Sequence, residues 1–312
     1  MVLAALAMSS LNESQEPELK SAPIEIAVRD VTVSYPVGKN GHKTVLSGLN
    51  LEIRSGEFVA VLGETGCGKS TLLRMILGQE FPTSGVVEVD GQCINRVDSR
   101  CGYVPQKYSL FPDRTMIQNV MYGPENAYGG WFVRLLPTFR KFKRRLRGEA
   151  EQQLLRMGLR AGDFHKYPHQ LSGGMQQRVA IAQALMMKPP VLLMDEAFSA
   201  LDPSTRASLQ QQLRAIWQET KPTVLFVTHN TSEALLLGSR LIVLGNYREA
   251  SQKSNVILDM QLPQSSEPIA VRKLSREFQE LSEFVKRRAY GSTPQSEPFQ
   301  PVQEISSRGD AI

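Results

Sequence analysis

A glycine-rich octapeptide early in the chain has the residue types that bind phosphate groups. It reads Gly63-Glu64-Thr65-Gly66-Cys67-Gly68-Lys69-Ser70, which fits G-x-x-x-x-G-K-[ST], and it lies between an apolar run and a helical pattern. The glycines let backbone N–H groups turn inward around phosphates, and the following helix adds the positive end of its dipole. We expect Lys69 to reach the β- and γ-phosphates and the Ser70 hydroxyl to coordinate Mg²⁺. A chance glycine turn is the alternative, and the agreement of strand, loop and helix argues against it.

Two adjacent carboxylates follow an apolar run that has the length of a buried strand. The run is Val191–Met194, and the carboxylates are Asp195 and Glu196. We expect Asp195 to hold Mg²⁺ through water, as the second acidic motif of phosphate-loop ATPases does. Glu196 is the candidate general base that polarises the attacking water. A strand end capped by solvated acids is the alternative, and without the phosphate loop it would be the better interpretation.

A serine and two glycines stand where another helix is expected to begin. Ser172 can cap that helix while Gly173 and Gly174 expose its first amide groups, which would make a second anion site on the same chain. An ordinary helix cap is the alternative interpretation of these three residues.

The segment around this serine resembles a family signature. Leu171–Arg178 reads LSGGMQQR, similar to the LSGGQ signature of ABC ATPases, with Met175 in the place of the usual glutamine. Asp195 follows Ser172 by 23 positions (195 − 172), much as the family places its strand. The resemblance covers about Ile24 to Leu244 and implies ATP as the nucleotide and Mg²⁺ as the metal. The nucleotide-binding residues that it implies are Tyr35, Gly63, Glu64, Thr65, Gly66, Cys67, Gly68, Lys69, Ser70, Thr71, Ser172, Gly173, Gly174 and Asp202.

Other residues match family positions in the family's order. Tyr35 matches the aromatic residue that stacks on adenine, although any strand can end in a tyrosine. Gln106 matches the glutamine that contacts Mg²⁺ and the attacking water. Asp202 ends the loop that crosses between subunits, and His229 matches the switch histidine on the γ-phosphate, although alone it would be a satisfied polar group at a strand end. The resemblance thus implies Glu196, His229 and Gln106 as catalytic residues and Ser70, Gln106 and Asp195 as metal ligands.

The chain divides into three parts by pattern. We expect a disordered leader over residues 1–23, an ABC ATPase domain over 24–246 with a helical subdomain at about 107–187, and a tail over 247–312 with one helix at about 270–288. The fold class that we predict is α/β, a P-loop ABC ATPase core with a mixed β-sheet, an antiparallel β edge and that helical subdomain. Within the subdomain, Pro137 is expected to kink or break one helix, and a separate helix is expected over Glu149–Met157. In the tail, the expected helix carries an apolar stripe of Leu274, Phe278, Leu281 and Val285.

Charge and cysteine usage restrict the function classes. The formal net charge is +5, but seven cations and no carboxylate lie between Trp131 and Arg147, so the excess is local. We expect this segment to face the membrane or a transport partner, with a solvated basic face as the alternative and nucleic acid disfavoured for want of a stacking platform. The three cysteines have neither disulfide-like nor metal-like spacing, which indicates a reducing cytoplasm, and no apolar run is long enough to span a membrane.

The family resemblance implies the energy-coupling subunit of an importer. It implies that two copies close around two ATP molecules beneath a separate permease, which receives solute from an extracytoplasmic binding protein, at the cytoplasmic face of the cell membrane. Val104-Pro105-Gln106 and Leu110-Phe111-Pro112 resemble the nitrate, sulfonate and taurine group, although guanidine or a related nitrogen compound is also a possible cargo. A soluble ABC ATPase acting on nucleic acid or ribosomes is the alternative, which a single cassette without a coiled-coil insertion disfavours.

Overall fold

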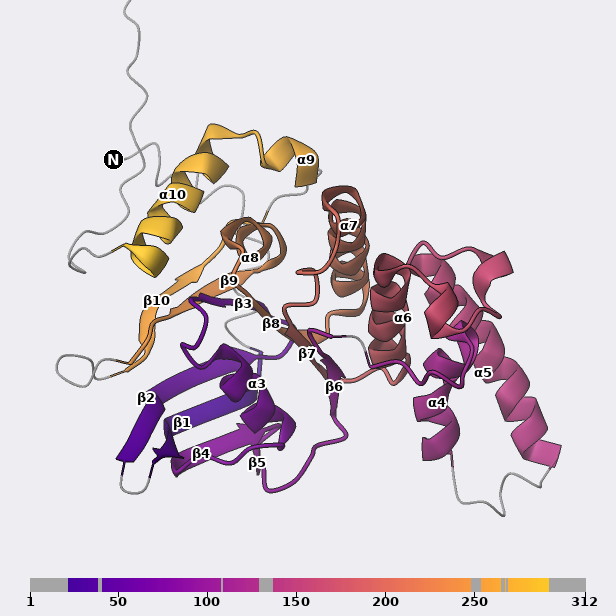
Figure 1. Ribbon diagram of the computed structural model, residues 1–312, viewed down its shortest axis with the longest axis horizontal. Coiled ribbons are helices and arrows are strands. Elements are labelled where there is room, and N and C mark those ends of the chain that lie inside the picture. Colours follow the sequence, from indigo (N-terminus) through magenta and orange to yellow (C-terminus); the bar gives the residue numbers. More distant parts are fainter. Residues whose placement is uncertain are drawn as a thin grey trace, which may run out of the picture.

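The computed structural model describes residues 22–38, 41–107, 109–128, 137–247, 254–264, 267 and 269–291, which are built around two β-sheets (Figure 1). The antiparallel sheet has the order β2-β1-β4-β5. Its strands are β1 (Ile24–Val37), β2 (Gly41–Arg54), β4 (Ser84–Val89) and β5 (Gln92–Cys93). The mixed sheet has the order β10-β9-β3-β8-β7-β6, parallel except for β10. Its strands are β3 (Phe58–Gly63), β6 (Cys101–Val104), β7 (Val191–Asp195), β8 (Thr223–Thr228), β9 (Arg240–Leu244) and β10 (Val256–Gln261).

The helices lie around these sheets in two groups. Figure 1 shows α3 (Lys69–Leu77) beside the antiparallel sheet, and α4, α5 and α6 together at the far end of the molecule. The bounds of these three are Met116–Ala127, Pro137–Arg156 and Gly173–Met186, and α7 is Pro203–Thr220. The C-terminal helices α8, α9 and α10 are Thr231–Leu237, Ile269–Arg272 and Arg276–Tyr290. The α/β class, the mixed sheet, the antiparallel sheet and the group of helices are as predicted.

The central strands of the mixed sheet, β3, β7, β8 and β9, are buried on both faces and almost wholly apolar, whereas the edge strands β6 and β10 are partly exposed. In β3, Val59 and Val61 face a core shared with α3 and the antiparallel sheet. The alternate residues Phe58, Ala60 and Leu62 face a second core shared with the other helices. Strands that are covered on both sides read as continuous apolar runs, which explains why the sequence pattern located them.

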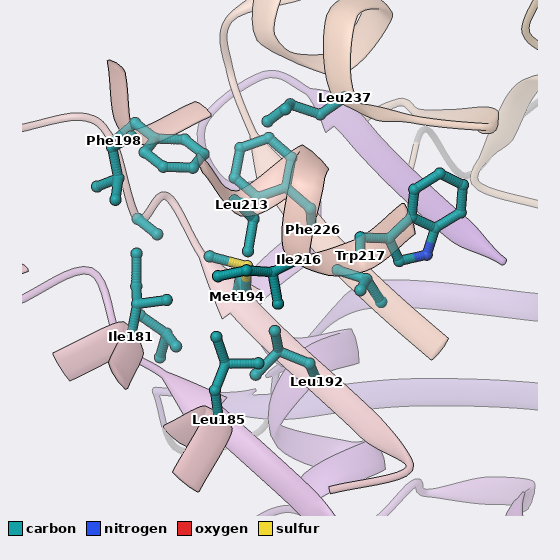
Figure 2. Packing of buried hydrophobic residues seen from close by; sticks show 14 of the residues in the cluster. Ile181, Leu185, Leu192, Met194, Phe198, Leu213, Ile216, Trp217, Phe226 and Leu237 are labelled. Carbon is teal, nitrogen blue, oxygen red and sulfur yellow. The ribbon is translucent and has the colours of Figure 1, made fainter. Parts of the chain in front are cut away.

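Aromatic and aliphatic side chains fill the second core, as Figure 2 shows. The Phe198 and Phe226 ring centroids are 5.3 Å apart, and Trp217 of α7 meets Phe58 edge-on at 5.7 Å. Edge-to-face pairs of this kind stabilise a core by roughly 0.5–1.5 kcal/mol beyond their buried area. This packing holds the carboxyl ends of β7 and β8 in fixed register.

The prediction of a separate helix over Glu149–Met157 is wrong, whereas a kink or break at Pro137 is not tested, because the residues just before it are not described. Helix α5 runs without interruption from Pro137 to Arg156, so no separate helix begins at Glu149. Proline is tolerated in the first turn of a helix, where its missing N–H would have no partner, and Gly148 is accommodated inside the helix. The buried side chains Leu146, Ala150 and Leu154 recur every four residues and hold α5 against the core. The expected apolar residues at 132–136 lie outside the described residues.

The C-terminal part also differs from the sequence prediction. The predicted polar tail contains β10, which pairs with β9 and was not foreseen. Helix α10 begins only at Arg276, after Ser275 caps it by accepting a hydrogen bond from the Phe278 N–H. Leu274 therefore precedes the helix and is 79% exposed, so it does not belong to the buried stripe. The expectations for residues 1–21 and 292–312 concern residues that are not described.

Candidate active site

The phosphate loop connects β3 to α3 in a conformation that only glycine adopts easily. Gly66 has φ +87° and Gly68 has φ +101°, and Gly68 is the residue before α3. A Cβ at Gly68 would lie 2.5 Å from Leu46, whereas a Cβ at Gly66 would meet nothing within 4 Å. The ammonium group of Lys69 donates to the carbonyl oxygens of Gly63 at 2.8 Å and Glu64 at 2.7 Å. The loop is thus an open-topped cradle with a buried cation at its base.

A hydroxyl and a carboxylate meet beside this cradle. Ser70, in the first turn of α3, donates from Oγ to Oδ1 of Asp195 over 3.2 Å. Burial raises the pKa of Asp195, and the hydrogen bond from Ser70 opposes that rise. Both groups are oxygen donors of the kind that Mg²⁺ prefers, so these residues fit the metal that the motif implies. The buried thiol of Cys67 has a raised pKa because of desolvation, as suits a packing residue.

The three residues expected to be catalytic lie together. The amide of Gln106 donates from Nε2 to Oε2 of Glu196 at 2.9 Å. His229 Nδ1 lies 3.1 Å from the other carboxylate oxygen of Glu196. Glu196 has φ +44°, a left-handed conformation that is strained for a glutamate, and its N–H donates to the carbonyl of Val227. Strands β6, β7 and β8 are neighbours in the sheet, so their carboxyl ends bring the three side chains to one edge.

The turn that carries His229 is fixed by residues that sequence reasoning missed. Thr228 Oγ1 donates to the buried carboxylate of Glu233 at 2.8 Å and accepts from the Asn230 N–H at 3.0 Å. Asn230 caps α8 by accepting from two of its first N–H groups. From outside, the hydroxyl of Tyr290 donates to the His229 carbonyl oxygen at 2.9 Å. Only the N-cap asparagine carried a signal in the sequence, because the other contacts depend on tertiary packing.

Tyr35 lies next to the helix that the phosphate loop opens. Its hydroxyl donates to Oε2 of Glu80 at 2.8 Å and lies 3.4 Å from Oγ1 of Thr71, the third residue of α3. The half-buried ring packs against the core on the antiparallel-sheet side. The structure thus places Tyr35 beside α3, and its stacking on adenine stays a prediction.

The remaining predicted site residues form a second group. Ser172 is exposed, and its Oγ accepts from the N–H of Met175, which caps α6 as expected. Asp202 caps α7 by accepting from the N–H groups of Ser204 and Thr205 and also accepts from the Ser204 hydroxyl at 2.6 Å. The hydrogen bond from that hydroxyl, followed by those at Thr205, lowers the pKa of Asp202. A Cβ at Gly174 would lie 2.9 Å from Thr205 Cγ2, so the two capped ends pack closely. Among the described residues, no recorded hydrogen bond joins this group to the phosphate-loop group.

Comparisons with known proteins agree with this arrangement. A family model described as ABC transporter matches residues 46–199. An uncharacterized ABC transporter ATP-binding protein of Methanocaldococcus jannaschii, MJ0412, is 40% identical over 240 residues, which cover 77% of this chain and 84% of that protein. The nitrate import ATP-binding protein NrtD of Synechococcus elongatus is 41% identical over 206 residues, covering 66% and 71%. The dimeric post-hydrolysis structure of the ATP-binding cassette MJ0796 with ADP and Pi is similar with a TM-score of 0.62 and 32% identity, covering 77% of this chain and 100% of that chain.

Proposed function

This chain belongs to the ABC transporter family of ATP-binding proteins and is an ATPase, and we propose that it is the energy-coupling subunit of an importer. The observation that carries the catalytic assignment is the carboxylate of Glu196, held between Gln106 and His229 at the sheet edge where the phosphate loop begins. A carboxylate held in this way is suited to accept a proton from water. We propose that each site residue has the role that was predicted for it from the sequence.

The chemistry follows from positioning and charge. In our proposal, Lys69 exchanges its two loop carbonyls for the β- and γ-phosphates of ATP, while the loop amides and the start of α3 bind the remaining oxygens. Ser70, Asp195 and Gln106 would hold Mg²⁺, which neutralises charge on the phosphates when bound. Glu196 takes the proton of the attacking water, and His229 contacts the γ-phosphate.

We further propose that a complete site needs two copies of the chain. Ser172 begins α6 with an exposed side chain, and among the described residues no recorded hydrogen bond joins its loop to the phosphate loop of its own chain. In a head-to-tail dimer, the Ser172 loop of each copy would face the nucleotide held by the other copy. The similar cassette MJ0796, whose solved structure is dimeric with ADP and Pi, supports this arrangement.

The transport partners are also part of the proposal. No helix among the described residues has the length and apolarity needed to cross a membrane. We therefore propose peripheral association with permease subunits at the cytoplasmic face, with an extracytoplasmic binding protein that delivers the solute. The likeness to a nitrate import protein supports a small anion or polar solute as cargo. We retain the division into a leader, an ATPase domain over 24–246 and a C-terminal part as a proposal.

Mixing two disabled variants tests the two-chain site. Lys69→Ala disables the phosphate loop, and Ser172→Asp places a negative charge at the second anion site while keeping a good helix cap. A mixed dimer has one site made from the intact halves of both copies. We expect the mixture to regain up to about a quarter of wild-type turnover, because half of random dimers are mixed and each has one intact site. A mixture no more active than the sum of its two components would contradict the shared site.

A further inference from the structure

The peptide unit that follows His229 has a polar partner from a distant part of the chain. The Tyr290 hydroxyl donates to the His229 carbonyl oxygen at 2.9 Å. No other hydrogen bond to that oxygen is recorded among the described residues. The two residues are 61 positions apart. Tyr290 is the last residue of α10, near the end of the described part of the chain. The turn that carries His229 is therefore contacted by a helix that is distant from it in the sequence.

The helix that carries Tyr290 is firmly anchored. Phe278, Leu281, Val285 and Ala289 are at most 8% exposed and belong to the same core as the aromatic residues of β3 and α7. Helix α10 packs against α8, the helix that begins two residues after His229. Tyr290 is the last residue of α10, and its position is thereby fixed relative to the start of α8. Tyr290 as a whole residue is 41% exposed, and its hydroxyl makes the specific contact to His229.

The contact completes the restraint of the turn. Thr228 and Asn230 fix the inner side of the turn through their hydrogen bonds to each other and to α8. The outward carbonyl of His229 is held only by the tyrosine, within the described part of the chain. The orientation of a peptide unit limits where its side chain can point, because χ1 preferences depend on backbone φ and ψ. Holding this carbonyl therefore favours the imidazole position that lies 3.1 Å from Glu196.

We propose that Tyr290 is a positioning residue for ATP hydrolysis, which acts by holding the His229 backbone so that the imidazole faces Glu196. The inference rests on the proposed catalytic roles of His229 and Glu196. It assigns α10 a part in hydrolysis, so a movement of the C-terminal part would change turnover. Burial raises the pKa of Tyr290, so the hydroxyl keeps its proton and its ability to donate at neutral pH.

The test is a double-mutant cycle with Tyr290→Phe and His229→Ala, measured as steady-state ATP hydrolysis by the full chain. Tyr290→Phe removes only the hydroxyl, and we expect kcat to fall about three- to tenfold, the effect of one neutral hydrogen bond. The KM for ATP and the melting temperature should not change. In the His229→Ala background, the same substitution should have no further effect, because its influence passes through the imidazole.

A tyrosine of equal exposure provides the control. Tyr128, which is 40% exposed, stacks on Phe142 of α5 away from the site, so Tyr128→Phe should leave kcat unchanged. If Tyr290→Phe has wild-type kcat while His229→Ala is impaired, the positioning role is wrong and the proposed function stands. The positioning role would also be overturned if Tyr290→Phe lowered kcat equally in the wild-type and His229→Ala backgrounds. The same holds if a lower melting temperature of Tyr290→Phe accounted for its loss of kcat. If His229→Ala itself hydrolyses ATP normally, the catalytic role proposed for His229 fails as well.

Discussion

The two helix N-termini that could bind phosphate differ in what already surrounds them. At the start of α3, the chain itself supplies a buried cation, a hydroxyl paired with a carboxylate, and the strained Glu196 nearby. At the start of α6, the Ser172 hydroxyl is used by its own helix. The neighbours of this loop are the capped end of α7 and the Gln176 side chain, which donates to the Pro168 and Leu171 carbonyls. The α3 end carries most of the groups that a nucleotide site needs, whereas the α6 end carries only a few of them.

This difference explains how one chain can depend on a second. A dipole end with exposed amides attracts anions, but without cations or carboxylates it can neither bind a nucleotide tightly nor cleave it. The α6 end thus contributes little to binding in an isolated copy and becomes effective only when a nucleotide arrives already bound. Substitutions at the two ends should consequently have different signatures.

The largest effect is expected at the α3 end. Lys69→Ala removes a charge-assisted contact to the phosphates that is made in both the ground state and the transition state. We expect kcat/KM for ATP to fall by at least about a hundredfold, with ATP affinity itself weakened about tenfold or more. Isothermal titration of ATP, together with steady-state hydrolysis, measures the two effects. If Lys69→Ala kept wild-type affinity for ATP, the α3 end would not differ from the α6 end in its contribution to ATP binding.

An intermediate effect is expected at the α6 end. Ser172→Asp keeps the helix cap, so the melting temperature should stay the same, but its charge repels a phosphate. We expect ATP affinity of the isolated chain to change by less than about twofold, while turnover falls roughly tenfold or more. Ser172→Asn is the matched control, since it also caps the helix without adding charge. If Ser172→Asp weakened ATP binding as strongly as Lys69→Ala does, the two helix ends of one chain would bind the same nucleotide.

The smallest effect on hydrolysis is expected at α5, which lies in the same group of helices as α6 but contributes no side chain to either end (Figure 1). Lys143, Arg145 and Arg147 pair with glutamates, whereas no ion pair to a described residue is recorded for the exposed Arg140, Lys141 and Arg144. If these three face an anionic membrane, each contributes about 1 kcal/mol to association. Reversing all three to Glu should abolish vesicle binding and leave soluble hydrolysis unchanged.

The control for this surface is another reversal of equal charge. Arg276, Lys286 and Arg287 are exposed on α10, and changing them to Glu alters the net charge by the same amount. Sedimentation with vesicles containing about 30% anionic lipid separates the two sets, with salt dependence as a second check. Equal binding by both variants would indicate that α5 presents a solvated basic face.

The local motifs could be predicted from the sequence, whereas long-range contacts could not. The phosphate loop, the strand before Asp195 and the cap by Ser172 are set by neighbouring residues, so their spacing indicates them. The roles of Gln106 and His229 came only from family resemblance, because a single glutamine or histidine has no local signature. Their approach to Glu196 depends on the order of β6, β7 and β8 in the sheet.

Other features depend on competition between local and tertiary effects. Pro137 is a helix breaker in an interior and a favourable residue in a first turn, and composition alone did not decide between these positions. Strand β10 is short and lies in a polar region, so its pairing with β9 was not evident. The contact between Tyr290 and His229 joins two segments 61 residues apart and has no trace in either local pattern.

The central claim is that Glu196 is the general base of ATP hydrolysis, and Glu196→Gln tests it most directly. Glutamine keeps the shape of the side chain and can still hydrogen-bond, but it cannot take a proton. We expect ATP affinity to stay within about threefold of wild type, while single-turnover cleavage of bound ATP slows by roughly a hundredfold or more. Rapid-quench measurement with excess enzyme reports cleavage without product release. Cleavage at the wild-type rate by this variant would contradict the role of Glu196.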